Sequence, residues 1–219
     1  MPKTPAARSR GRPAKLSRDQ ILDCALKLIE RSPGQKITMT GVAKALGTAP
    51  MSLYTHVKHR DDLMDGIAEK VMGQIDLELD PTAPWEDGVR EWLNRCHKHL
   101  SGYPQVVPLL PEGNRIPPSW LRVHAPLIEC LHRAGFRDAA LAQASQWVAH
   151  QLLSALVMTM ARPKSINMQK QLNAALGAIS AEQQAIFKEI LPHVTPDRKL
   201  FPYSVEQIIL ALKARLDAR

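Results

Sequence analysis

The residues in this sequence with the clearest potential to bind a partner are basic, and the first of them form the segment Arg10-Gly11-Arg12-Pro13. Two arginines beside one glycine make a narrow, extended and doubly charged segment. Such a segment can enter the minor groove of A·T-rich DNA, where the groove is narrow and its potential is most negative. The alternative is a solvated basic tail that only improves solubility. Arg10 and Arg12 are therefore predicted DNA contacts.

The distribution of charge along the chain also indicates a polyanionic partner. The 219 residues carry a formal net charge of +8. Residues 1–60 hold 12 Lys and Arg against 3 Asp and Glu, whereas residues 61–219 hold 17 basic and 18 acidic residues. A basic N-terminal region on a nearly neutral remainder predicts that the first part binds a polyanion and that the remainder has a different task.

Patterns for metal binding or catalysis are weak. Cys96-His97 with His99, and Cys130 with His132, place potential ligands close in sequence. Residues one or two apart on a helix point in different directions, so neither group converges by itself. A zinc site needs about four ligands at matched spacings, and no GxSxG, HExxH or GxxxxGK[ST] pattern occurs. We therefore expect no enzyme activity, no metal and no cofactor.

Several features predict a cytoplasmic protein. Cys24, Cys96 and Cys130 are too widely spaced for a disulfide framework, which favours a reducing compartment. The basic N-terminus lacks the apolar stretch of a secretory signal. Residues 139–161 contain no charged residue, but polar side chains interrupt them about once per turn. We expect this segment to be a buried helix and not a membrane span.

The basic region is predicted to contain a helix-turn-helix. Ser17 and Gln20 form a capping-box pattern, so a first helix is expected to begin at Ser17 and to end at Ser32-Pro33-Gly34. Short helices are predicted over residues 40–46 and 50–56. The turn between them contains Gly47, which can adopt a positive φ and let the second helix cross the first.

The rest of the chain is also predicted to be helical, since no run of alternating β-branched residues is found. A fourth helix is expected from Arg60 to just before Pro81. The later helices are expected over residues 85–101, 104–110, 118–134, 138–161, 166–176, 180–191 and 204–217. The last two are expected to begin with the same capping-box pattern, at Ser180 and at Ser204. The predicted all-α chain thus has a flexible basic arm (1–16), a helix-turn-helix domain (17–62), a connecting helix (63–80) and a helical body (81–219).

Residues 37–60 closely resemble the DNA-binding segment of the TetR family of bacterial transcriptional regulators. The shared features are T-x-x-x-V-A-x-x-L-G, which starts at Thr38, L-Y-x-H-V, which starts at Leu53, and the basic residues before the fourth helix. The resemblance covers about residues 17–75. The body is more loosely similar to TetR ligand-binding bodies, through Trp85-Glu86-Asp87 and Ala134-Gly135-Phe136.

The spacing around the third helix predicts which of its faces meets DNA. Leu53 and Val57 are expected to anchor it to Val42 and Leu46. The opposite face then presents four residues to base edges: Ser52 and Thr55 as hydrogen-bonding groups, and Pro50 and Met51 as packing partners for thymine methyls.

Phosphate contacts are expected on either side of this face. The resemblance implies that Tyr54 and His56 contact phosphates, although both could also be partly buried packing groups, Tyr54 above all. Thr38 and Thr40, at the start of the second helix, and Lys58 and Arg60, before the fourth, are placed to do the same.

Tryptophans on three predicted helices of the body indicate a small-molecule pocket. An apolar cavity with few polar groups is the usual composition of such a site, and the resemblance implies an effector pocket there. The alternative is an ordinary hydrophobic core. The drug- and magnesium-binding pattern of the tetracycline repressor is not found, so the inducer is not expected to be tetracycline. The candidate lining residues are Trp92, Leu100, Leu110, Trp120, His124, Leu127, Trp147 and Gln151.

Two apolar helices are expected to pair with their symmetry mates in a homodimer, as TetR-like bodies do. They are the uncharged segment 139–161 and the C-terminal helix with its apolar stripe. The alternative is that both belong to the core of one subunit. The predicted interface residues are Val148, Leu152, Ala155, Val205, Ile208, Ile209, Leu212 and Leu216.

These features predict a homodimeric, ligand-responsive transcriptional regulator. In this prediction, two DNA-binding heads occupy successive major grooves of a palindromic operator. The protein is expected to act as a repressor that leaves the operator when a small, largely apolar molecule binds to it. A ligand-independent architectural DNA-binding dimer is the first alternative. An enzyme with a DNA-binding appendage is the second.

Overall fold

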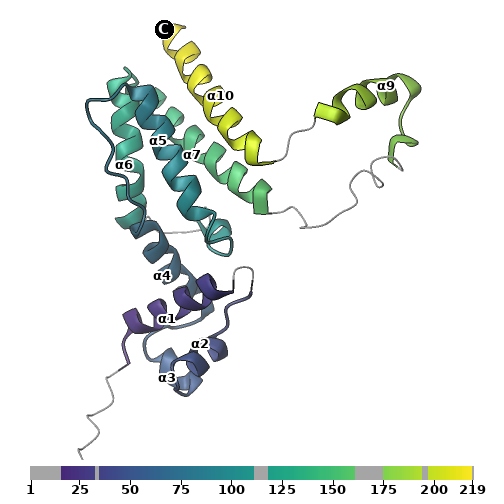
Figure 1. The fold of residues 1–219 in the computed structure, drawn as a ribbon. Helices are drawn as coiled ribbons and strands as arrows, with labels where there is room; N and C mark the ends of the chain where they lie inside the picture. The colour runs from purple at the N-terminus through teal and green to yellow at the C-terminus, as the bar shows by residue number, and fades with distance from the viewer. Residues whose placement is uncertain (1–15, 33–34, 111–117, 161–174, 194–196, 219) are drawn as a thin grey trace, which may run out of the picture.

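The computed structural model of the chain describes residues 16–32, 35–110, 118–160, 175–193 and 197–218. Every regular element within these ranges is helical, which confirms the all-α prediction. Figure 1 shows a small group of three N-terminal helices at one end and a larger helical body at the other, with α4 between them. The elements are α1 (Arg18–Arg31), α2 (Met39–Ala45), α3 (Pro50–Tyr54), α4 (Arg60–Gly73), α5 (Trp85–Leu100), the 3₁₀ turn η1 (Val107–Leu109), α6 (Pro118–Arg133), α7 (Asp138–Met160), α9 (Ala181–Ile190), η2 (Leu191–His193) and α10 (Asp197–Asp217).

The N-terminal helices begin and turn where local chemistry dictates. The Ser17 hydroxyl accepts from the Gln20 amide at 3.2 Å, and the Gln20 side chain accepts from the Ser17 amide at 3.1 Å, which is the predicted capping box. The Thr38 hydroxyl caps α2 by accepting from the Gly41 amide. Gly47 adopts φ 66° between α2 and α3, a conformation that costs glycine little.

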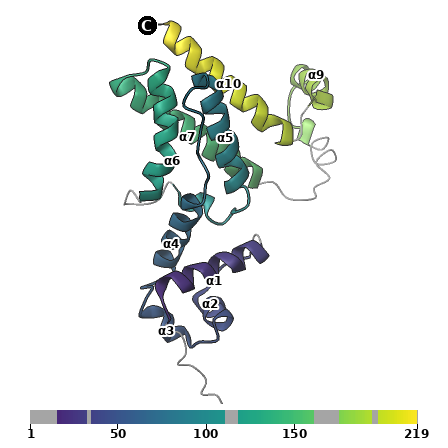
Figure 2. The same ribbon diagram turned by 60° about the vertical axis from the view of Figure 1, so that its left-hand side comes forward.

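The chain after α4 differs from the prediction. The helix ends at Gly73, and residues 74–80 form no helix. Here Ile75, Leu77 and Leu79 are half-buried while the acidic residues between them are exposed. Burial that alternates at every second residue is typical of an extended chain and not of a helix. Figures 1 and 2 show this segment running beside α5 and α6 to the far end of the body, where α5 begins.

Three smaller differences concern the other predicted helices. Residues 104–110 contain only the 3₁₀ turn η1, and α3 is five residues long. The C-terminal helix begins at Asp197 and includes Pro202, so Ser204 lies inside it and donates to the Leu200 carbonyl instead of capping. The early turns are held by packing, since the Phe201 ring stacks on His97 of α5 with centroids 3.7 Å apart. Residues 161–174, which include most of the predicted helix 166–176, lie outside the described part of the chain.

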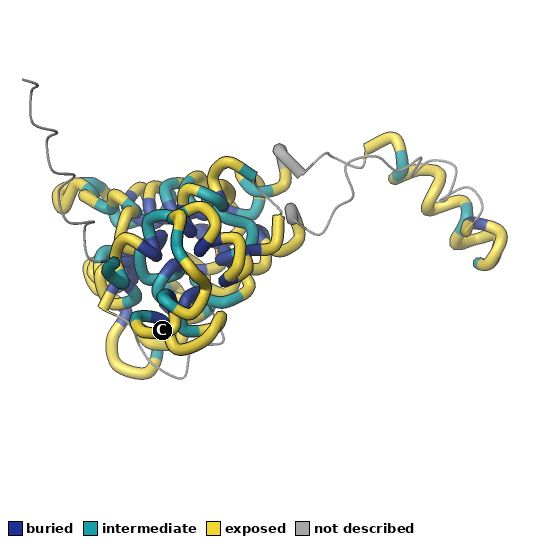
Figure 3. The backbone as a smooth tube through the Cα atoms, turned by 90° about the horizontal axis from the view of Figure 1, so that it is seen from below, coloured by how far each residue is buried: buried dark blue, intermediate teal, exposed yellow. Residues whose placement is uncertain are grey.

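One hydrophobic core runs through the N-terminal helices, α4 and the body. Its fully buried members include Ile29 in α1, Ile67 in α4 and Trp92 in α5. In contrast, α9 contributes no buried residue, and Figure 3 shows it lying away from the rest of the molecule. The core therefore makes α1–α7 and α10 one packed unit, within which α4 joins the N-terminal helices to the body.

Candidate nucleic-acid interface

The third helix has one buried and one exposed face, as predicted. Leu53, Val57 and Val42 are completely buried, so α3 is anchored on its inner side. On its outer side, the Met51 side chain is 74% exposed, and Pro50 and Thr55 are also exposed. A large exposed apolar side chain on a helix-turn-helix is placed to pack against thymine methyl groups in a major groove.

Thr55, the residue that caps the C-terminal end of α3, is hydrogen-bonded to the main chain of Ser52 within the helix. The Thr55 hydroxyl donates to the Ser52 carbonyl at 2.7 Å. The Thr55 oxygen can still accept a hydrogen bond, for which the amino groups of adenine and cytosine are the partners in the major groove. Ser52 is half-buried and therefore less accessible than the sequence predicted.

The predicted phosphate contacts lie at the ends of neighbouring helices. Thr38 and Thr40 are exposed at the start of α2, Tyr54 is 45% exposed, and His56 is half-buried. The exposure of Tyr54 favours the contact over the packing alternative. No Asp or Glu occurs between Arg31 and Arg60, so this whole segment offers a phosphate backbone no repulsive charge.

Arg60 has a structural contact that the sequence did not reveal. Its Nε donates to the Ile37 carbonyl at 3.3 Å, which joins the start of α4 to the residue before Thr38. The Arg60 side chain nevertheless remains 45% exposed. Arg60 can therefore position α2 and bind a phosphate at the same time.

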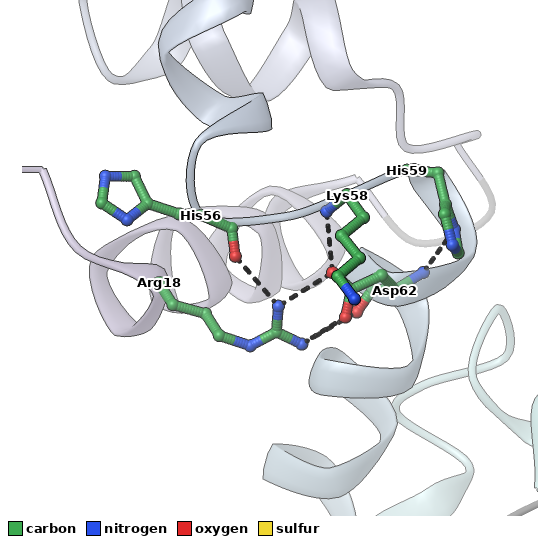
Figure 4. A network of polar contacts seen from close by, with 5 residues as sticks. All are labelled: Arg18, His56, Lys58, His59 and Asp62. Carbon is green, nitrogen blue, oxygen red and sulfur yellow. Dashed lines mark hydrogen bonds and ion pairs between the residues drawn. The ribbon is translucent and has the colours of Figure 1, made fainter.

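Behind α3, a polar network centres on Arg18 and Asp62, neither of which was a predicted site residue (Figure 4). The Arg18 guanidinium donates to both Asp62 carboxylate oxygens, at 2.7 and 3.0 Å, and to the His56 carbonyl at 3.1 Å. Asp62 also accepts from the Lys58 amide at 2.8 Å. The hydrogen bonds from Arg18 hold the pKa of Asp62 below its ordinary value.

This network fixes the backbone that carries the basic residues. Arg18 lies on α1, His56 and Lys58 follow α3, and Asp62 lies in the first turn of α4. The His59 Nδ1 accepts from the Asp62 amide at 3.1 Å and caps α4. The main chain of Lys58 is therefore held in place while its side chain is exposed. Arg10 and Arg12 lie outside the described residues.

The predicted pocket residues are partly brought together. Trp120 stacks on His124 with ring centroids 3.9 Å apart, and Trp92 lies 6.0 Å from the same ring while its Nε1 donates to the Val123 carbonyl. Burial lowers the pKa of His124, because desolvation disfavours the charged form of its ring. Leu100 and Leu127 belong to the core, Leu110 and Trp147 are half-buried, and Gln151 is exposed.

The predicted dimer residues are mostly inside the chain's own core. Ala155 and Leu216 are half-buried, whereas the others are at most 4% exposed and so are not surface residues that a second copy would meet: Val148, Leu152, Val205, Ile208, Ile209 and Leu212. The exposed faces of the same helices include Val157 and Met158 on α7 and Leu210 on α10.

Among the residues that the structure describes, no group of three or more His, Cys, Asp or Glu side chains is arranged to hold a metal ion. Within the same part of the chain, no helix is long and apolar enough to cross a membrane.

Comparison with solved structures identifies the architecture. The Streptomyces coelicolor TetR family protein ActR, in complex with actinorhodin, superimposes with a TM-score of 0.79 over 93% of this chain and 99% of that one, at 19% identity. The chain has the TetR-family fold. At this identity the likeness concerns the fold alone, and the helix-turn-helix resemblance in the sequence is consistent with it. No protein-family model matches the chain.

Relatives in sequence agree with this architecture. An HTH-type transcriptional regulator of Saccharopolyspora erythraea is 25% identical over 152 residues, which cover 69% of this chain and 64% of that protein. An uncharacterized HTH-type transcriptional regulator of Mycobacterium tuberculosis is 39% identical over 70 residues, or 32% of each chain. The matches thus span less than two thirds of these relatives. Both relatives are described as HTH-type transcriptional regulators.

Proposed function

We propose that the chain is a homodimeric, DNA-binding transcriptional regulator of the TetR type that binds a palindromic operator. The observation that carries the proposal is the exposed face of α3, where Met51 projects from a helix firmly anchored by Leu53. The candidate base-reading residues lie within a segment that carries basic residues and no carboxylate. Duplex DNA is recognised in this way, with base contacts for sequence and basic residues for the phosphates. Arg10 and Arg12 would add contacts in the minor groove.

The test is selection of bound sites from random double-stranded DNA with the purified chain. We expect a palindrome whose half-sites lie about one helical turn apart. Met51→Ala should keep nonspecific binding and change preference at one position in each half-site. Enrichment of no sequence, or of a site without dyad symmetry, would contradict the proposal.

For regulation, we propose that a small, largely apolar molecule binds beside Trp92, Trp120 and His124 and that the DNA is then released. Support comes from the neighbouring contact between α6 and α4: the Glu69 carboxylate accepts from both the amide and the hydroxyl of Ser119. Trp120, next in sequence to Ser119, lies in the aromatic group. A ligand that displaces Trp120 would therefore move the end of α6 that is bonded to α4.

Titration of apolar compounds against tryptophan fluorescence tests this second part. A ligand that quenches the fluorescence should lower operator affinity, and Ser119→Ala should weaken that coupling while leaving ligand binding in place. If operator affinity stayed the same in the presence of every ligand that binds, the chain would instead be the ligand-independent architectural DNA-binding dimer.

A further inference from the structure

The loop between α5 and η1, residues 101–106, forms a direct connection between the body and the N-terminal helices that does not involve α4. The Tyr103 hydroxyl donates to the Glu30 carboxylate at 3.0 Å. The Gln105 side chain donates through Nε2 to the Gln35 carbonyl at 2.6 Å. Glu30 lies in the last turn of α1, and Gln35 lies on the way to α2.

The 101–106 loop is itself fixed to the body. Val106 and the adjoining Val107 are at most 1% exposed, and η1 packs against both α4 and α7. The Tyr103 ring lies 5.2 Å from that of His99 on α5. Because its base is buried in this way, the loop cannot follow a movement of the N-terminal helices without breaking its two hydrogen bonds.

The N-terminal helices and α4 in turn form one rigid unit. Arg18 binds Asp62 through two hydrogen bonds, and Lys70 of α4 pairs with Asp19, at 2.7 Å, and with Asp23. Between these ion pairs the two helices approach closely, since a Cβ on Gly66 would come within 2.6 Å of the Leu22 side chain. Clamps at both ends of a close contact prevent α1 from rotating on α4.

These two sets of contacts hold opposite ends of α1. The clamp to α4 uses residues 18–23, and the 101–106 loop reaches Glu30 and, beyond the helix, Gln35. A helix of 14 residues spans about 20 Å. Because the N-terminal helices and α4 form one unit, the attachment of the 101–106 loop at the far end of α1 resists rotation of that whole unit relative to the body.

We infer that Tyr103 and Gln105 are positioning residues that set the angle between the N-terminal helices and the body, and through it the half-site spacing that the dimer accepts. The inference rests on the proposed function, because spacing has a meaning only for two heads on one operator. Neither residue needs to touch DNA. Their effect is on the separation of two α3 helices, which must match the repeat of the double helix.

The experiment repeats the selection from random DNA with full-length variants and scores half-site sequence and half-site spacing separately. Tyr103→Phe/Gln105→Ala should enrich the wild-type half-site but with several spacings instead of one. On the wild-type spacing, its affinity should fall by about 2- to 10-fold for each hydrogen bond lost. Thermal unfolding followed by circular dichroism checks that the variant is folded.

Glu30 supplies a matched control. Glu30→Ala and Glu30→Gln remove the same charge, so both change nonspecific electrostatics equally, but only the glutamine side chain of the second variant retains an oxygen that accepts from Tyr103. We expect Glu30→Ala to broaden the spacing and Glu30→Gln to preserve it.

The outcomes separate this inference from the proposed function. A wild-type chain that enriches no palindrome would overturn the proposed function and this inference with it. Suppose instead that the wild-type chain enriches a palindrome with one spacing, and that both Tyr103→Phe/Gln105→Ala and Glu30→Ala keep that spacing unchanged. This result would overturn the inference and leave the proposed function standing.

Discussion

Arg18 lies where three segments of the DNA-binding region meet, and its role follows from its partner. In the sequence it is one more basic residue in a basic region, because Asp62 is 44 positions away and nothing local connects the two. In the structure its guanidinium donates to Asp62 and to the His56 carbonyl. The predicted DNA contacts could be listed from local spacing, whereas the pair that orients them depends on tertiary contact.

The Arg18–Asp62 pair predicts a pH-dependent contribution to stability. Arg18 holds the pKa of Asp62 below its ordinary value, so the ionised carboxylate stabilises the fold above about pH 4, and this stabilisation is lost as the pH falls through the folded-state pKa. Asp62→Asn should lower the free energy of unfolding by about 1 kcal/mol at pH 7, a modest value because the Arg18 side chain is 42% exposed.

Urea unfolding of both proteins at a series of pH values measures this contribution. The difference in unfolding free energy should shrink as the pH falls through the lowered folded-state pKa of Asp62, because the wild-type carboxylate then becomes protonated as well. A difference that stayed constant over the whole range would show that Asp62 acts through its shape and not through its charge.

Substitution of Lys58 is expected to change DNA binding without changing the free energy of unfolding. Its side chain is exposed, and only its amide belongs to the Asp62 network. Lys58→Ala should weaken binding to all sequences alike and reduce the slope of log affinity against log salt by about one unit, as the loss of one phosphate contact does. Binding isotherms at several salt concentrations measure the slope. Lys98→Ala, an exposed lysine on α5, should leave it unchanged.

At the scale of elements, helix starts were predictable where a side chain caps its own backbone. Ser17 and Ser180 both form the predicted capping boxes. The same pattern at Ser204 was misleading, because Phe201 stacks on His97 and the helix continues through Pro202. Local signals decide a helix end only where tertiary packing does not compete with them.

The contact between α5 and α6 depends on the absence of a side chain at Gly88. A Cβ there would overlap the sulfur of Cys130, a residue that is 1% exposed and has no room to move. Gly88→Ala should therefore lower the free energy of unfolding by about 1–2 kcal/mol, although alanine is the better helix former, because overpacking outweighs propensity. Denaturant unfolding gives the value.

A second substitution tests the cause of that loss. Cys130→Ala removes the sulfur, so Gly88→Ala should cost little or become stabilising in this background. An equal loss in both backgrounds would mean that the α5–α6 contact is not limited by these two residues.

At the scale of the whole molecule, the distribution of charge predicts that the basic N-terminal region and the nearly neutral remainder have different tasks. The surface that meets a second copy was harder to predict. An uncharged helix is apolar on nearly every side, so its sequence does not say which side faces the subunit's own core. On the C-terminal helix, the structure buries Ile209 at 2% exposure and leaves its neighbour Leu210 at 57%.

This difference decides which substitution tests the proposed dimer. Ile209→Glu would place a carboxylate in the chain's own core, where an unpaired charge costs several kcal/mol, and would unfold the protein whether or not it dimerises. Leu210→Glu places the same charge on the exposed face of α10. We expect this variant to remain folded by circular dichroism, to be monomeric by light scattering and to lose at least about tenfold in operator affinity, since one head alone makes half of the contacts.

Leu121→Glu is the matched control, because Leu121 is 59% exposed on α6 and receives the same change of size and charge. It should remain dimeric and retain its operator affinity. If Leu210→Glu stayed dimeric, the exposed face of α10 would not be the contact between subunits. If both variants became monomeric, the contact would extend to α6, and the two heads would then sit on the operator in a different relative orientation.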